Sequence, residues 1–179
     1  MFAFAIWNRE TLLLARDRLG IKPLYYSENL GSFRFASTPQ ALTAAGGVDT
    51  GIDAVALHHL FTLHAVVPAP RTIFNGIRKL APGTTLTVNA RGELSHRKYW
   101  SLKAQRPAVP KSEAEWTEAI HESLRQAVKK RIEIADVKVG VLLSGGLDSS
   151  LLVALLAEQG GPDLMTFSVG FEEIGRAHV

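Results

Sequence analysis

Short apolar runs in the first third of the chain predict β-strands joined by a tight turn. Residues 2–7 and 12–16 are two such runs, and the polar residues 8–10 between them suit a hairpin. Residues 33–36 predict a further strand, and Thr38–Pro39 predicts the start of a short helix, since proline is tolerated in the first turn. A chain that opens directly in a strand leads us to expect neighbouring strands encoded upstream.

The middle of the chain changes from helical to alternating periodicity. Residues 53–65 carry apolar side chains mostly at helical spacing, with Asp53 as the N-cap, and 66–70 form a proline-rich turn. Residues 84–89 and 93–100 then predict a second hairpin. Three histidines in the helical segment lack the i, i+4 spacing that aims two imidazoles at one metal, so we interpret them as packing or surface residues. They are His58, His59 and His64.

A long amphipathic helix is predicted after a stretch without periodicity. Residues 101–111 contain two prolines and read as a linker. Ser112 and Glu115 form a capping-box pattern, and apolar residues follow at helical spacing up to Ile132. The basic residues 129–131 near its end are what a helix C-terminus favours in any protein, so they do not indicate a nucleic-acid surface.

Residues 137–159 predict a buried strand, a glycine-containing turn and an apolar helix. Branched residues within 139–143 are typical of a parallel strand. Residues 151–157 are apolar on nearly every side, so we expect that helix to be covered on more than one face. Gly160 and Gly161 suit its end, and Pro162 forbids its continuation. A second strand at 164–169 implies a right-handed parallel crossover.

The turn at 144–150 combines the features of a phosphate-binding loop. Two glycines allow close backbone approach, and the following helix start presents free N–H groups and a partial positive charge. Serine hydroxyls add donors, while Asp148 suits either a magnesium ion or a helix cap. The loop has no basic residue and lacks the Gly-x-x-x-x-Gly-Lys spacing. An ordinary capped turn is the alternative, but the full Ser144–Ser150 string is more specific than such a turn requires.

Composition narrows the class of protein without identifying it. The 179 residues can hold one domain or two small ones, and no run approaches the length of a membrane span. The opening MFAFAIW lacks the basic flank and cleavage site of a signal peptide. The absence of cysteine excludes disulfides and thiolate metal sites and fits a cytoplasmic setting. The net charge of +3 is too small to indicate nucleic-acid binding.

Two independent strings resemble one enzyme family. The sequence SGGLDSS at 144–150 matches the pyrophosphate loop of ATP-pyrophosphatase (PP-loop) domains, and GVLLSGG at 140–146 resembles the glutamine-hydrolysing asparagine synthetases among them. Upstream, MFAFAIW, RDRLGIKPLYY and FRFAS resemble the last part of the glutaminase domain of the same family. Taken alone, RDRLGIKPLYY also suits a surface turn with a solvated charge pair.

The resemblance implies an α+β fold followed by an α/β fold. Residues 1–100 would be the C-terminal part of an N-terminal-nucleophile glutaminase domain with antiparallel strands. Residues 101–111 would be the linker, and 112–173 the N-terminal part of a parallel-sheet ATP-binding domain. Residues 174–179 do not continue the family pattern and match the translation of a common sequencing adapter, so we expect a non-native tail. Since one crossover with two strands cannot cover both sheet faces, we expect this domain to be cut short.

By resemblance, the parent enzyme adenylates a carboxylate with ATP and Mg²⁺ and amidates it with ammonia released from glutamine. The segment ALHHLFTLHAVVPAPRTIF is most similar to N-acetylglutaminylglutamine amidotransferases, so the acceptor would be aspartate or that modified dipeptide. The full-length enzyme could form a homodimer, with no nucleic-acid or membrane partner. The residues matched to the ATP and pyrophosphate site are Leu143, Ser144, Gly145, Gly146, Asp148, Ser149, Ser150, Val169 and Gly170, with Asp148 as the candidate magnesium ligand.

One departure from the family bears directly on activity. The glutaminase nucleophile of the family is an N-terminal cysteine, and this chain contains no cysteine. We therefore assign no catalytic residue and predict that the polypeptide alone is inactive in glutamine hydrolysis and amide synthesis. Two alternatives are another PP-loop ligase, acting on tRNA or a nucleotide, and a non-catalytic nucleotide-binding subunit. The former predicts no glutaminase sequence ahead of the loop.

Overall fold

The computed structural model describes residues 1–29, 31–160 and 164–170. The chain divides into two compact units, residues 1–104 and residues from 105 onward. The division falls inside the segment 101–111. The expected tail at 174–179, like Gly161 and Pro162 of the predicted helix stop, lies outside the described residues. None of the described helices is both long enough and apolar enough to cross a bilayer.

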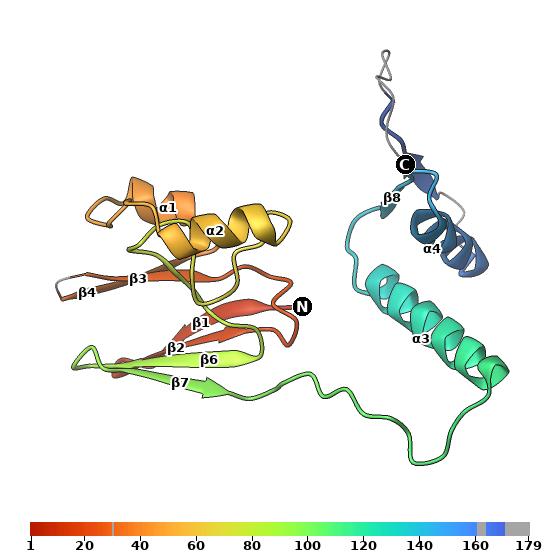
Figure 1. The fold of residues 1–179 in the computed structure, drawn as a ribbon, viewed down its shortest axis with the longest axis horizontal. Coiled ribbons are helices and arrows are strands. Elements are labelled where there is room, and N and C mark those ends of the chain that lie inside the picture. Colours follow the sequence, from red (N-terminus) through yellow and green to blue (C-terminus); the bar gives the residue numbers. More distant parts are fainter. Residues whose placement is uncertain (30, 161–163, 171–179) are drawn as a thin grey trace. The chain divides into compact units, whose positions relative to one another are not determined.

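A four-stranded antiparallel sheet, called sheet A below, forms one layer of the first unit (Figure 1). Its strands are β1 (Ala3–Trp7), β2 (Thr11–Arg16), β6 (Thr84–Asn89) and β7 (Leu94–Lys98), in the order β1-β2-β6-β7. Both predicted hairpins are confirmed. In the first, the side chain of Asn8 accepts the N–H of Thr11 at 2.8 Å, and Arg9 adopts a φ of 78°. The turn therefore closes through an Asx contact.

A three-stranded antiparallel sheet, called sheet B below, forms the second layer. Its order is β4 (Ser32–Ala36), β3 (Tyr25–Asn29) and β5 (Arg78–Lys79). β4 was predicted, whereas β3 and β5 were not. The sequence of residues 16–25, which leads into β3, reads as a charged turn. β5 has only two residues, too few to show a periodicity. Both strands exist because β3 pairs with partners on its two sides.

Two helices cover the face of sheet B that points away from sheet A (Figure 1). α1 (Pro39–Ala44) starts at Thr38, whose hydroxyl accepts the N–H of Ala41, and α2 (Ala54–Thr62) starts at Asp53. Both predicted helix starts are confirmed, and Asp53 is the N-cap as predicted. α2 is shorter than the expected 53–65, because His64 and Ala65 take positive φ angles of 48° and 64°. The first unit is thus a layer of helices over two antiparallel sheets.

The core of the first unit lies between the two sheets. Alternate residues of β6 are buried, as a strand with one inward face requires. Tyr26 of β3 stacks on Phe33 of β4 with ring centroids 5.6 Å apart. The buried cluster consists of Leu14, Leu24, Tyr26, Leu80, Leu86 and Val88.

The turn that follows β2 is held by two buried charges. The alternative of a solvated charge pair is therefore wrong, although Leu19 and Ile21 in the turn are 64% and 48% exposed. Arg16 and Asp17 are only 7% and 5% exposed. The Arg16 guanidinium donates to the carbonyls of Gly20 and Leu80, both at 2.6 Å, and of Lys22 at 2.9 Å. Main-chain N–H groups satisfy the Asp17 carboxylate. Burying each charge is tolerated because its hydrogen-bonding groups are paired.

Backbone donors also set the acidity of Asp17. Its oxygens accept N–H groups from Phe2, Leu19, Ile21 and Lys22 at 2.9–3.3 Å. Burial raises the pKa of the carboxyl, but these four hydrogen bonds together hold the pKa below its usual value. The turn is therefore organised around an ionised side chain.

The second unit contains a long helix followed by a strand–helix–strand unit. α3 (Glu113–Glu133) carries the predicted capping box between Ser112 and Glu115. β8 (Gly140–Leu142) and β9 (Met165–Phe167) flank α4 (Leu147–Glu158) and pair in parallel, as predicted. Gly160, just past α4, has a φ of 73°, which suits a helix end.

The expectation that the helix after the loop is covered on more than one face is wrong for the described residues. α4 contacts α3 and β8, and Leu155 is its one buried residue among them. Leu151 and Leu152 remain 39% and 42% exposed. Two three-residue strands present too little surface to cover a helix that is apolar all round.

Candidate nucleotide-binding site

The sequence-predicted site residues meet at the carboxyl edge of the parallel pair β8–β9. The N–H of Leu143 donates to the carbonyl of Phe167 at 2.8 Å, continuing the ladder past the end of β8. The hydroxyl of Ser168 donates to the carbonyl of Leu143 at 2.7 Å. Val169 and Gly170 follow Ser168 directly, so they leave the sheet at the edge where the loop begins. In parallel sheets this edge is where ligands bind.

Ser149 organises the loop between β8 and α4. Its hydroxyl oxygen lies 3.3 Å from the N–H of Ser144, 3.1 Å from the Ser144 hydroxyl and 3.1 Å from the carbonyl of Gly146. The Ser144 hydroxyl also accepts the N–H of Gly146 at 3.4 Å. Ser149, in the first turn of α4, thus holds the loop that leads into this helix.

The start of α4 presents backbone donors outward. Gly146 is the N-cap and has no side chain to accept a bond, and the N–H of Ser150 donates to its carbonyl at 3.1 Å. The N–H groups at the first helical positions have no intrahelical acceptor. Gly145 has a φ of 82°, and a Cβ at this position would meet nothing within 4 Å. A side chain would therefore have space here, and glycine is favoured because of its positive φ angle.

Asp148 does not cap the helix. It lies in the first turn of α4, where its charge favours the helix dipole, but the cap position belongs to Gly146. No group of three or more metal-ligating side chains occurs in the described part of the chain. Mg²⁺ in phosphate sites commonly takes one or two carboxylates and completes its shell with phosphate and water. A single exposed carboxylate in the first turn of α4 is compatible with that chemistry.

Sequence reasoning missed Ser168. Its hydroxyl joins the two strand ends, yet a serine after a predicted strand is too common to single out. The glycines, serines and Leu143 of the predicted site do come together, with Val169 and Gly170 next to them along the chain. Leu147, which the prediction passed over, is 84% exposed at the mouth of the loop.

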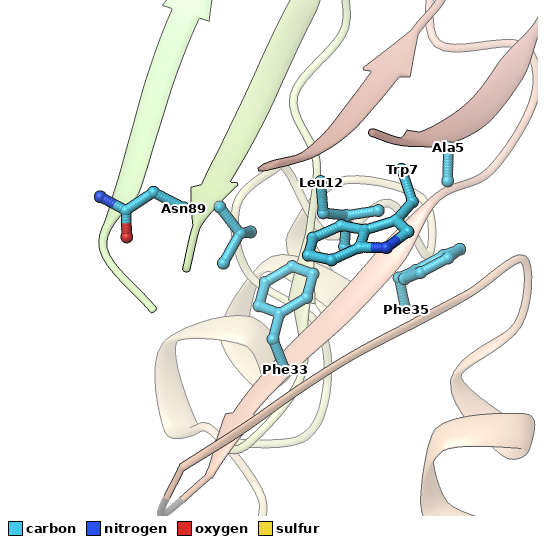
Figure 2. Close-up of a pocket in the computed structure, with 7 residues that line it drawn as sticks. Ala5, Trp7, Leu12, Phe33, Phe35 and Asn89 are labelled. Carbon is cyan, nitrogen blue, oxygen red and sulfur yellow. The ribbon is translucent and has the colours of Figure 1, made fainter. Parts of the chain in front are cut away.

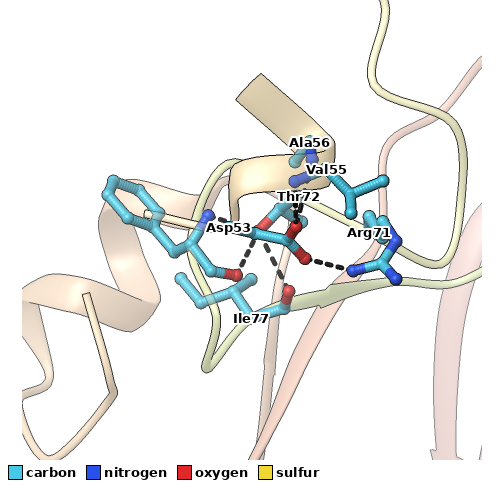
Figure 3. A network of polar contacts seen from close by, with 7 residues as sticks. Asp53, Val55, Ala56, Arg71, Thr72 and Ile77 are labelled. Atoms are coloured by element: carbon cyan, nitrogen blue, oxygen red, sulfur yellow. Dashed lines mark hydrogen bonds and ion pairs between the residues drawn. The ribbon is translucent and has the colours of Figure 1, made fainter. Parts of the chain in front are cut away.

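A second polar network, in the first unit, serves structure (Figure 3). Asp53 accepts the N–H groups of Val55 and Ala56 at 2.9 and 3.0 Å and forms an ion pair with Arg71. The hydrogen bond from Ala56 is the largest of the contributions that lower the pKa of Asp53. Thr72 donates to the carbonyl of Ile77 at 2.9 Å. These contacts tie the start of α2 to the segment that leads into β5.

Two family models match the chain. Residues 1–100 match a glutamine amidotransferase domain, and residues 119–178 match asparagine synthase. Because a glutaminase-type domain precedes the loop, a PP-loop ligase without such a domain is not favoured.

Known relatives match along the whole chain. It is 37% identical over 181 residues to asparagine synthetase [glutamine-hydrolyzing] 1 of Bacillus subtilis, a match that covers 100% of this chain and 28% of the relative. It is 35% identical to asparagine synthetase [glutamine-hydrolyzing] 3 of the same species, covering 97% of this chain and 28% of the relative. A putative asparagine synthetase [glutamine-hydrolyzing] of Mycobacterium bovis is 36% identical, with coverages of 100% and 28%. The chain therefore spans little more than a quarter of these relatives' length.

A solved structure was also found: glutamine phosphoribosylpyrophosphate amidotransferase from B. subtilis, at 16% identity and a TM-score of 0.33, covering 97% of this chain and 34% of that one. The family assignment rests on the sequence matches. The match to the glutamine amidotransferase domain alone covers more than half of the chain. The two antiparallel sheets in residues 1–104 agree with a glutaminase-type domain in this part of the chain. The chain belongs to the glutamine-hydrolysing asparagine synthetase family.

Proposed function

We propose that this chain is part of an ATP-dependent, glutamine-hydrolysing amidotransferase, a carbon–nitrogen ligase of the asparagine synthase type. The parent enzyme adenylates a carboxylate and lets ammonia from glutamine displace AMP. The observation that carries the proposal is the loop of residues 143–150 at the start of α4, encoded in one chain with a glutaminase-type domain. We propose that this second unit is the start of a PP-loop ATP-binding domain.

The loop supports binding of pyrophosphate through neutral donors. The backbone N–H groups at the start of α4 and the hydroxyls of Ser144, Ser149 and Ser150 can donate to phosphate oxygens. Charge on the leaving pyrophosphate grows as the carboxylate attacks the α-phosphorus of ATP. Donors that are already oriented stabilise that charge without reorganisation. Leu143, Val169 and Gly170, at the strand ends, are proposed to line the adenine and ribose pocket.

Asp148 is the residue that would hold Mg²⁺ in this part of the site. A bound Mg²⁺ would neutralise phosphate charge and orient the leaving group. The carboxylate is exposed in the first turn of α4, so it can reach a ligand seated at the loop.

The acceptor is proposed to be aspartate or N-acetylglutaminylglutamine. The relatives named above are asparagine synthetases, which favours aspartate. The segment ALHHLFTLHAVVPAPRTIF resembles the dipeptide-using subgroup, which favours the dipeptide. Further proposals are a cytoplasmic setting, consistent with the lack of cysteine, and a homodimer of the full-length enzyme.

An assay of AMP release separates the two acceptors. The full-length enzyme, recovered by extending the gene locus, is incubated with ATP, Mg²⁺ and glutamine together with either acceptor. The proposal expects AMP and pyrophosphate in equal amounts with one acceptor and neither product without an acceptor. Release of ADP would contradict it, because that would indicate a different phosphoryl chemistry.

The 179-residue polypeptide itself is predicted to be inactive. Glutamine hydrolysis in this family needs a thiol nucleophile, and the chain has no cysteine. Purified chain should therefore release no glutamate from glutamine above background. Measurable glutaminase activity that persists through purification to homogeneity would refute this prediction.

A further inference from the structure

The parallel ladder between β8 and β9 ends in an exchange of donors. The register pairs Leu142 with Phe167, and the N–H of Leu143 donates to the Phe167 carbonyl at 2.8 Å. The next bond of an evenly spaced parallel ladder would join the N–H of Val169 to the carbonyl of Leu143. Among the described residues no main-chain N–H takes that place, and the Ser168 hydroxyl donates to this carbonyl at 2.7 Å. A side chain thus ends the ladder in place of the backbone.

The peptide group between Leu143 and Ser144 is held from two sides. Its carbonyl accepts the Ser168 hydroxyl, and its N–H, which belongs to Ser144, donates to the Ser149 hydroxyl oxygen at 3.3 Å. Ser168 directly follows β9, and Ser149 lies in the first turn of α4. Because a peptide group is planar, bonds to its two opposite polar groups restrict its orientation. The direction in which the chain enters the loop therefore depends on both serines.

The groove of the first unit differs from the loop in its lining. Aromatic and aliphatic side chains surround it, including those of Trp7, Phe33 and Phe35, with Asn89 as the amide among them (Figure 2). A lining of this kind offers few donors to a phosphate, whereas a helix start preceded by a glycine turn offers several. The polar contacts around Leu143 are therefore the ones that bear on nucleotide binding.

Loss of the Ser168 hydroxyl would let the ladder continue by one bond. Without a side-chain donor, the Leu143 carbonyl can accept the N–H of Val169, as the regular spacing of a parallel ladder favours. The main chain of Val169 would then be drawn toward the start of the loop. Both ends of that new bond belong to residues proposed above to line the adenine and ribose pocket. The identity of residue 168 therefore bears on the width of that pocket.

The geometry points to Ser168 as a positioning residue for the nucleotide: its hydroxyl holds the Leu143 carbonyl, so that the loop and the Val169 main chain stay apart and receive the adenosine part of ATP between them. This role rests on the proposed ATP-dependent function. Ser168 acts through Leu143 and Val169 and does not itself touch the ligand. Its role differs from that of Ser149, which lies within the loop and is proposed to donate to phosphate.

Steady-state kinetics of the full-length enzyme test this role. We expect Ser168→Ala to raise the KM for ATP about 3–10-fold, the equivalent of one hydrogen bond, and to leave kcat and the KM for glutamine unchanged. Ser168→Thr keeps a hydroxyl and should stay close to the parent enzyme. Thr166→Val is the matched control, because it removes an exposed hydroxyl from β9 itself and should leave the KM for ATP unchanged.

Amide hydrogen exchange, followed by NMR on the 179-residue chain, tests the ladder without any nucleotide. The N–H of Val169 should exchange more slowly in Ser168→Ala than in the parent chain, because it then enters the ladder, and unchanged exchange would overturn the proposal.

The kinetic outcomes separate this role from the proposed function. A parent enzyme that binds no ATP would contradict the proposed function, and the nucleotide role of Ser168 with it. A parental KM for ATP in Ser168→Ala, or equal losses in Ser168→Ala and Ser168→Thr, would contradict the role of Ser168 alone. A general loss of activity with a lowered unfolding temperature would assign Ser168 to packing and would also overturn the proposal.

Discussion

The hydroxyl of Tyr99 donates a hydrogen bond to the main-chain carbonyl of Arg16 at 2.7 Å, across 83 positions of sequence. Tyr99 follows β7, and Arg16 ends β2 just before the turn that Asp17 organises. The N–H of Tyr99 in addition donates to the carbonyl of Gly83 at 2.8 Å. The end of the first unit is thus fastened to the end of β2, next to the buried charges of Arg16 and Asp17.

Tyr99→Phe should therefore destabilise the first unit. The substitution keeps the ring and leaves the Arg16 carbonyl without this donor, so the expected loss in the free energy of unfolding is about 0.5–1.5 kcal/mol. Urea denaturation followed by circular dichroism measures it. Tyr99→Leu, which also removes the ring, should cost more. Equal stability of Tyr99→Phe and the parent chain would show that water replaces the hydroxyl at no cost.

The lowered pKa of Asp17 predicts that the stability of the first unit depends on pH. Its folded-state pKa lies below the unfolded value, so its ionised form contributes stability at every pH above the unfolded pKa. That contribution is lost as pH falls through the folded-state pKa. The free energy of unfolding should decline below about pH 4. Asp17→Asn should be less stable near neutral pH and should show a shallower decline in acid, and an unchanged acid profile would contradict this role.

Gly83 should tolerate substitution far less than Gly92. Both have positive φ, 60° and 79°, so alanine is strained at either position. A Cβ at Gly83 would lie 2.5 Å from the main-chain oxygen of Trp100, whereas one at Gly92 would meet nothing within 4 Å. Gly92→Ala should cost about 1–2 kcal/mol from strain alone, and Gly83→Ala distinctly more. Thermal unfolding of the two variants makes the comparison, and similar losses would show that Trp100 moves freely.

Ser149→Ala should weaken binding of magnesium pyrophosphate. The hydroxyl orders the loop through Ser144 and Gly146 and is a proposed donor to phosphate, so an affinity loss of about 3–10-fold is expected, the equivalent of one hydrogen bond. Isothermal titration calorimetry on the chain measures it. Ser123→Ala on α3, whose hydroxyl donates to Ala119 at 2.7 Å, is the matched control and should leave the affinity unchanged. If both variants bind as the parent chain does, the loop does not hold phosphate through Ser149.

Local chemistry was enough to predict many elements of this fold. The first hairpin follows from two apolar runs around Asn8, and the caps at Asp53 and Ser112 follow from side chains that accept nearby N–H groups. The parallel strand–helix–strand unit follows from its apolar runs and the glycine turn between them. Each of these signals acts within a few residues, so a single sequence displays it.

Other elements depend on partners distant in sequence. β3 exists because β4 and β5 pair with it, and β5 is too short to carry a pattern of its own. The exposure of Leu151 and Leu152 was likewise not predictable, because apolar composition does not tell how much surface the neighbouring elements provide.

The sequence by itself determined the glycine- and serine-containing turn of residues 144–150 and the family to which the chain belongs, because both signals lie in adjacent residues. Tertiary structure alone decided that Arg16 and Asp17 are buried, since the carbonyl of Leu80 and the N–H of Phe2 reach them from distant positions in the chain. It also decided that Ser168 joins the loop. Which residues are buried or paired depends on which surfaces meet in the folded chain. The order of charged and apolar residues along the sequence does not specify those surfaces.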